Sequence, residues 1–149
     1  MGADLYINSL FESHHAEWER TFEAALKLRE ELADGGAARE QAQDEVSRCY
    51  EEMYSRGYFR DSYNDFDLLW QFKLSWWKDV IPLLDEHGRL SVSATRRLLK
   101  LLDMRQSIFD ERLDELSADA QECFCKKRVR FRNFLNQAIA LNEPIDCSL

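Results

Sequence analysis

The sequence has few of the residues that interrupt helices or favour strands. Its 149 residues include five glycines, two prolines and only eleven β-branched residues, namely four Val, five Ile and two Thr. Leu, Ala, Glu and Arg are abundant, and these side chains favour helix over strand. The glycines stand where periodic apolar patterns stop, so most long segments run uninterrupted. This composition favours an all-α fold over a strand-rich one.

Long apolar runs and a basic excess are also missing. No stretch approaches the roughly 20 apolar residues of a membrane-spanning helix, and the N-terminus has no basic segment followed by an apolar one. We therefore expect no membrane association and a cytoplasmic location, in which all four cysteines are reduced thiols. The net charge of −8 argues against nucleic acid as the main ligand, because binding to phosphates needs clustered basic charge.

Motifs of common enzyme classes are absent from the sequence. It contains no Gly-x-Ser-x-Gly nucleophile elbow, no glycine-rich phosphate loop and no dinucleotide fingerprint. A nucleophilic pair of Cys49 with His15 has no supporting local signature. The sequence therefore favours a protein that is not an enzyme and that needs no cofactor.

The histidines offer one weak metal motif. Glu12 and His15 have the Glu-x-x-His spacing that places a carboxylate and an imidazole on one helix face in di-iron bundles. A di-iron site needs a second such pair, and the only other candidate, His87, has no glutamate three residues before it. A mononuclear site built from His14, Glu17 and a residue elsewhere is the remaining metal hypothesis. The competing interpretation is a histidine that is simply hydrogen-bonded in place, and we favour no metal.

The segment 62–86 contains three of the four tryptophans and is apolar on more than one side. Read at helical spacing, Phe66, Trp70 and Trp77 belong to one face, and Phe72 and Trp76 to another. A helix with large apolar groups on opposite faces needs neighbours all around it. We therefore predict a central, Trp-rich helix.

Apolar spacing predicts helices on both sides of this segment. Two precede it, at about 10–32 and 38–56, and we expect them to be antiparallel neighbours because a short Gly-Gly loop joins them. Two or three follow it, with the last helix beginning at Ser117 and a break near Asp103 left open. The prediction is one all-α domain over residues 1–149, a bundle of about five helices.

The two ends of the chain have different patterns. Residues 3–8 alternate apolar and polar side chains, which predicts a short extended arm. Residues 142–149 include Pro144 and have no clear period, so we expect an irregular tail.

Charge and aromatic residues suggest where a partner binds. Residues 1–57 contain 13 acidic and 6 basic side chains, whereas the one basic cluster, 126–132, is expected to lie on a solvated helix flank or a bundle seam. Tyr50, Tyr54 and Tyr58 lie four residues apart, as a core rim or as a stacking wall for a partner.

Two functional hypotheses follow. In the first, the protein is an acidic binding or regulatory module that recognises another protein, one of basic character, through its Glu-rich first helices and exposed tyrosines. In the second, Tyr50, Tyr54, Trp70 and Trp77 line a pocket for a small planar or apolar ligand, with or without a metal near His14.

Overall fold

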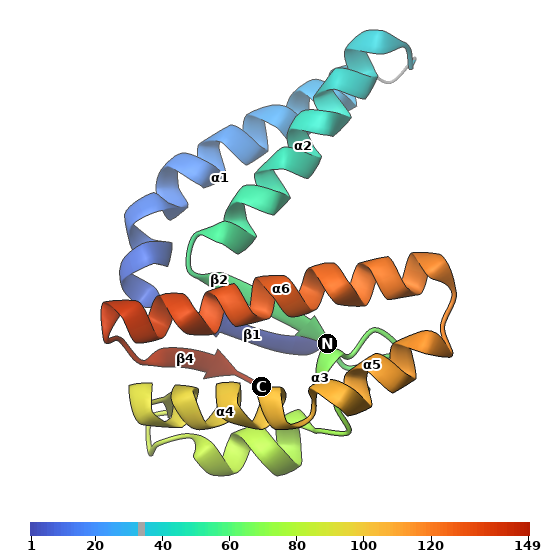
Figure 1. The fold of residues 1–149 in the computed structure, drawn as a ribbon. Coiled ribbons are helices and arrows are strands. Elements are labelled where there is room, and N and C mark those ends of the chain that lie inside the picture. The colour runs from blue at the N-terminus through green and yellow to red at the C-terminus, as the bar shows by residue number, and fades with distance from the viewer. Residues whose placement is uncertain (33–34) are drawn as a thin grey trace. The chain divides into compact units, whose positions relative to one another are not determined.

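The computed structural model describes residues 1–32 and 35–149, without the side chains of residues 53–55. The chain is mostly helical, as its composition predicts, but it also contains a four-stranded antiparallel sheet (Figure 1). The all-α prediction is therefore right for most of the chain and wrong for the sheet. No helix within the described residues is long and apolar enough to cross a bilayer.

Contacts divide the chain into two compact units. The hairpin unit comprises residues 8–57, and the sheet unit comprises residues 1–7 and 58–149. The helices of the hairpin unit are α1 (Asn8–Glu31) and α2 (Ala37–Ser55). The elements of the sheet unit are β1 (Gly2–Tyr6), β2 (Tyr58–Ser62), α3 (Leu68–Gln71), the π-helix η1 (Trp76–Val80), the 3₁₀ helix η2 (Ile81–Leu83), β3 (Arg89–Leu90), α4 (Val92–Met104), α5 (Gln106–Asp114), α6 (Ala118–Leu141) and β4 (Ile145–Ser148). The sequence predicts one domain over residues 1–149. This division is made by contacts alone, so the single domain stays a prediction.

The sheet has the strand order β2-β1-β4-β3, with every neighbouring pair antiparallel. The residues predicted as an extended arm form β1, a central strand that pairs with β2 on one side and β4 on the other. Ala3 and Leu5 alternate along it and are fully buried, as is Ile7 just after it. β1 pairs with β2 from Gly2↔Ser62 to Tyr6↔Tyr58. Residues 8–57 therefore occupy the connection between two neighbouring antiparallel strands.

The C-terminal segment is not the irregular tail expected from the sequence. Residues 145–148 form β4, which pairs with β1 at Leu5↔Cys147 and with β3 at Leu90↔Ile145. Residues 145–148, which follow Pro144, are too few to show an alternation of apolar and polar side chains. They become a strand because β1 and β3 offer backbone donors and acceptors on either side.

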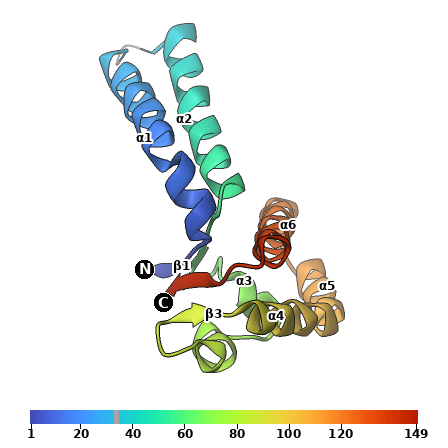
Figure 2. The same ribbon diagram turned by 90° about the vertical axis from the view of Figure 1, so that its left-hand side faces the viewer.

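Helices cover one face of the sheet within the sheet unit (Figure 2). Phe59 of β2 stacks on Phe131 of α6, with ring centroids 4.6 Å apart, and lies 6.1 Å from Phe134. Trp76 reaches the same cluster, 5.8 Å from Phe131. All four rings are buried, so the core of this unit lies between the sheet and α6.

The segment 62–86 is not a central helix. It contains α3, η1 and η2, and it is broken at Lys73, whose φ of +53° is outside the helical range. Separate caps begin the two short helices, because the Asp67 side chain accepts from Trp70 N and the Ser75 side chain accepts from Trp77 N. The chain therefore turns, and of the three tryptophans in this segment only Trp76 is buried in the core.

A buried carboxylate holds this broken segment together. Asp61 is fully buried, and its side chain accepts from Leu68 N at 3.0 Å and from Trp76 Nε1 at 2.8 Å. Lys127 of α6 lies 2.6 Å from the same carboxylate. A buried charge needs such pairing and hydrogen bonding to be tolerated. Asp61 thus joins β2, α3, η1 and α6.

Candidate functional site

A row of rings runs along one face of α1. Its members are Phe11, His15, Trp18 and Phe22, with Tyr50 of α2 beside the last of them. Steps of four and three residues place the four α1 rings on the same face of the helix. Successive α1 rings have centroids 4.5, 5.8 and 4.9 Å apart and interplanar angles of 27°, 20° and 13°. Tyr50 meets Phe22 edge-on at 5.0 Å. We call these five residues the aromatic row.

The seam between α1 and α2 is narrow and does not cover the aromatic row. Trp18 anchors the row, because its Nε1 donates to the carbonyl oxygen of Cys49 at 2.6 Å. The other buried seam residues are small, namely Ala25 of α1 and Ala42 and Val46 of α2. Beside these small side chains, each of the four α1 rings keeps part of its surface in solvent.

Solvent reaches much of the aromatic row. Among the described residues of the 24-residue α1, Ala25 is the one that is buried. The four α1 rings are half-buried, and Tyr50 exposes 46% of its surface. A helix that packs into a finished core normally buries a continuous apolar stripe. The row is therefore an apolar surface that the hairpin unit leaves partly in water.

Three glutamates border the aromatic row. Glu12, Glu19 and Glu23 each directly follow a ring residue of α1, so each lies about 100° around the helix from that ring. All three are exposed. Glu19 lies 3.9 Å from Nε2 of His15. The hairpin unit as a whole has 12 acidic and 6 basic side chains, so the row lies in an acidic surrounding.

Comparison with protein-family models, with curated proteins and with solved structures finds no match to this chain. The chemistry of the hairpin unit must therefore be argued from its own residues.

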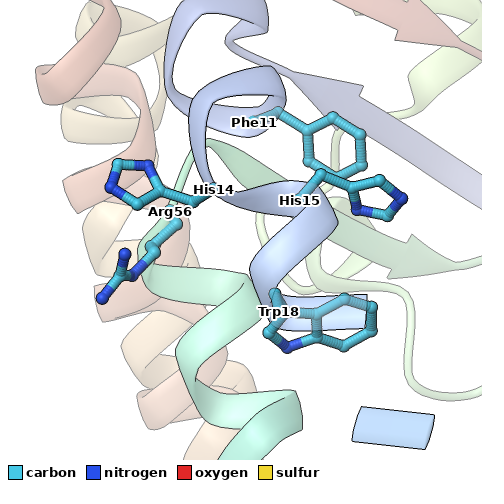
Figure 3. Close-up of a pocket in the computed structure, with 5 residues that line it drawn as sticks. All are labelled: Phe11, His14, His15, Trp18 and Arg56. Carbon is cyan, nitrogen blue, oxygen red and sulfur yellow. The ribbon is translucent and has the colours of Figure 1, made fainter. Parts of the chain in front are cut away.

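The histidines of the weak metal motif point to different surroundings (Figure 3). His15 lies in the aromatic row, whereas His14 lies on the side of α1 nearer Arg56. Nδ1 of His14 is 2.8 Å from Ser13 Oγ and 3.2 Å from the Leu10 carbonyl oxygen, so this nitrogen is engaged by its own helix. No group of three His, Cys, Asp or Glu side chains is arranged to hold a metal within the described residues, and Glu12, Glu17, His14 and His15 are no exception.

A polar cleft of about 250 Å³ lies on the other side of the seam. Its charges are largely paired within α2, because Arg48 lies 2.5 Å from Glu45 and Arg56 lies 2.8 Å from Glu52. The cleft is lined by His14, Glu17, Trp18, Thr21, Arg48, Glu52 and Arg56. The cleft is mostly polar, so it offers a small apolar ligand few contacts.

The structure does not support Cys49 and His15 as a catalytic pair of nucleophile and base. His15 is stacked between Phe11 and Trp18. Cys49 is buried in the seam, and burial raises the pKa of its thiol, with Glu45 adding to the effect. A thiol with a raised pKa is a poor nucleophile, because the reactive species is the thiolate.

The tyrosines expected to share one stripe are separated. Tyr50 lies in the aromatic row, and the side chain of Tyr54 is outside the described residues. Tyr58 belongs to β2, where it is 7% exposed and donates its hydroxyl to Asp4 at 2.5 Å. Burial, followed by this hydrogen bond, raises the pKa of Tyr58. Tyr58 is therefore a structural side chain of the sheet unit.

The two tryptophans expected in the core are on the surface instead. Trp70 exposes 61% and Trp77 exposes 55% of its surface, whereas Trp76 exposes 1%. The Arg112 guanidinium lies over the Trp70 ring, 5.2 Å from its centroid, and Tyr63 lies 5.6 Å from Trp77. Side chains this exposed do not line an enclosed pocket.

The basic cluster 126–132 is largely used within the chain. Lys127 pairs with Asp61, and Arg132 pairs with Asp103. Arg128 lies over the Phe109 ring, 5.6 Å from its centroid. Most of the cluster therefore joins α6 to the elements packed against it and does not form a free basic patch.

The helix predicted over about 10–32 contains the four α1 rings at three- and four-residue steps, but the sequence did not indicate that they stay partly exposed. One signal lies in the facing helix, where the buried residues that the structure describes, Ala42, Val46 and Cys49, are small beside Trp18 and Phe22. Comparing side-chain volumes across a predicted helix pair would reveal the mismatch.

Proposed function

We propose that the protein is a binding module whose hairpin unit receives an amphipathic, basic helix of another protein on the aromatic row. The observation that carries the proposal is that four rings of α1 are stacked in order yet left partly exposed, with carboxylates beside them. We retain a cytoplasmic location as part of this proposal.

A helix is the partner element that suits the row. The rings follow one another along the axis of α1, so the apolar surface is long and narrow. A third helix laid along α1 would present apolar residues at three- and four-residue steps to these rings. Ordered aromatic stacks also change little on binding, which lowers the entropic cost of association.

The charge of the row's border favours a basic partner. Glu12, Glu19 and Glu23 would face Lys or Arg residues that flank the apolar stripe of the incoming helix. Arg and Lys also interact favourably with exposed aromatic faces. An acidic helix would meet repulsion at the same positions.

Binding of designed peptides tests this proposal. The probe is an amphipathic helical peptide with Leu and Met on one face and Lys and Arg beside it, and the comparison peptide replaces each basic residue with Glu. We expect the basic peptide to bind with a Kd in the range of about 1–100 µM, measured by calorimetry at low salt. The acidic peptide should not bind, and added salt should weaken the complex.

Matched variants locate the binding surface. Glu19→Lys combined with Glu23→Lys should weaken peptide binding at least tenfold, because it reverses the border charge. Glu30→Lys combined with Glu31→Lys makes the same charge change at the far end of α1 and should leave the affinity within about twofold. Equal losses in both pairs would show a non-specific charge effect and reject the proposal.

A pocket for a small planar ligand, the second hypothesis from the sequence, has less support. Tyr50 belongs to the hairpin unit, whereas Trp70 and Trp77 belong to the sheet unit and are exposed. A thermal-shift screen with flat ligands and divalent metals tests this alternative. A stabilisation that disappears in Trp70→Ala or Trp77→Ala would favour it over the peptide-binding proposal.

A further inference from the structure

The outer face of α4 carries a short basic stripe. Arg96, Arg97 and Lys100 are exposed, while Leu98 and Leu102 on the opposite face are buried in the core. In the part of the chain that the structure describes, none of the three basic side chains has an ion-pair or hydrogen-bond partner. They differ in this from Lys127 and Arg132, which are paired within the chain.

An exposed methionine continues the stripe. Met104 ends α4 and exposes 69% of its surface, more than Trp70 or Trp77. It lies four residues after Lys100, as Lys100 lies four residues after Arg96, so the three share one side of the helix. The outer face of α4 is therefore basic along most of its length and apolar at its C-terminal end.

We infer that α4 of one copy of this chain docks on the aromatic row of a second copy. The inference rests on the proposed function of the row and names its partner: a helix that is basic with an apolar residue on the same side. α4 has the chemistry that the row requires, because its cations would meet the bordering carboxylates and its methionine would meet the rings.

The spacing of the two surfaces agrees with this contact. Arg96 and Lys100 are four residues apart, and so are Glu19 and Glu23. Four residues span about 6 Å along a helix, so the two cations have the same spacing as the two carboxylates. An antiparallel arrangement therefore sets Arg96 against Glu23 and Lys100 against Glu19. Continuing by four residues sets Met104 against His15.

Charge also favours a second copy of the chain over nucleic acid as the partner of the basic stripe on α4. Three free cations on one helix make few phosphate contacts, and a chain of net charge −8 repels a polyanion. The acidity is concentrated in the hairpin unit, which has a net charge of −6, whereas the sheet unit has −2. The strongest negative surface of a second copy is thus the hairpin unit itself.

Sedimentation velocity of the full chain tests the inference. Over about 5–500 µM protein, the weight-average mass should rise with concentration at low salt and fall back at high salt. Arg96→Glu combined with Lys100→Glu should weaken self-association at least tenfold, and so should Glu19→Lys combined with Glu23→Lys. Lys73→Glu combined with Lys78→Glu is the matched control on the sheet unit and should associate like the wild type.

Mixing the two charge-reversed chains is the decisive measurement. Each alone is expected to be monomeric, but the Arg96→Glu/Lys100→Glu chain still has an intact row, and the Glu19→Lys/Glu23→Lys chain has an intact stripe. A mixture should therefore regain one contact, in which the intact stripe meets the intact row. Circular dichroism of each variant verifies that it is folded.

The outcomes separate this inference from the proposed function. A chain that stays monomeric at every concentration, or variants and controls that associate equally, would overturn the docking of α4. If the basic peptide still bound the row in that case, the binding function would stand and its partner would be a different protein. Loss of peptide binding together with retained self-association would instead place the contact elsewhere and reject both.

Discussion

Two aspartates at the start of the Trp-containing segment have opposite electrostatic surroundings. Asp61 is buried but has Lys127 and three backbone or indole donors. Asp67 is partly exposed and caps α3. Burial, with repulsion from Asp61 next, raises the pKa of Asp67 to about 6. Asp67 is thus a carboxyl group that folding drives towards its protonated form.

This raised pKa predicts that stability falls between about pH 4 and pH 6. The folded state holds more protons than the unfolded state in that window, so the stabilisation present below pH 4 is lost as pH rises through the folded pKa. Asp67→Asn keeps the cap and should flatten the profile. Because Asp67 is partly exposed, we expect the variant to be more stable at pH 8 by only about 1 kcal/mol.

Urea denaturation at a series of pH values measures this effect. Asp65→Asn makes the same charge change at an exposed neighbouring position and should retain the wild-type slope. A variant curve for Asp67→Asn that parallels the wild type would show that another group causes the pH dependence.

At the scale of elements, the segment from Ser62 to Glu86 shows how a local break reverses side-chain burial. Lys73, with positive φ, separates α3 from η1, and adjacent tryptophans then face opposite ways. Trp76 fills the core and donates to Asp61, whereas Trp77 lies on the surface. The two substitutions should therefore differ greatly in cost.

We expect Trp76→Ala to lower the free energy of unfolding by about 3–5 kcal/mol, because it leaves a large cavity and removes one of the donors to the buried Asp61 carboxylate. Trp77→Ala should cost less than about 1 kcal/mol. Chemical denaturation of both variants measures the difference. Similar losses would mean that the indole of Trp77 is as buried as that of Trp76, contrary to the structure.

The hairpin unit illustrates a second element-scale principle. Among the side chains that the structure describes, the buried ones of the seam are Ala25, Ala42, Val46 and Cys49, which are small and bury little apolar surface. The large rings of α1 lie beside these small residues and are partly exposed to solvent. Under the proposed function, the helix of a partner would add apolar contacts to these rings.

At the scale of the whole molecule, the hairpin unit occupies a strand connection. Gly2 to Tyr6 and Tyr58 to Ser62 pair in continuous register, so the ends of the insertion are adjacent. Antiparallel neighbours of this kind are ordinarily joined by a short turn. The sheet unit has its own core of Phe59, Trp76 and Phe131. It therefore contains what an independent fold requires.

Replacing residues 8–57 with a short Asn-Gly linker should leave the sheet unit folded. We expect a cooperative thermal transition and retained near-ultraviolet circular dichroism from the buried Trp76. A spectrum without near-ultraviolet signals would show that the sheet unit requires the hairpin unit. The shortened chain should also bind no basic peptide, since it lacks the aromatic row.

The sequence by itself determined the elements that depend on local pattern. The helix over about 10–32 is observed at Asn8–Glu31, the helix over 38–56 at Ala37–Ser55, and the last helix begins after the Ser117 cap as predicted. Periodicity and capping act between residues a few positions apart, so they can be read along one chain.

The tertiary structure decided what depends on distant partners. β4 exists because β1 and β3 lie on either side of Ile145–Ser148, and Trp76 rather than Trp70 is buried because Asp61 and Phe131 receive it. The partial exposure of the aromatic row is likewise a tertiary property, since it depends on which side chains of α2 face the rings. Such burial is set by the volume and polarity of groups far away in sequence, which no local period encodes.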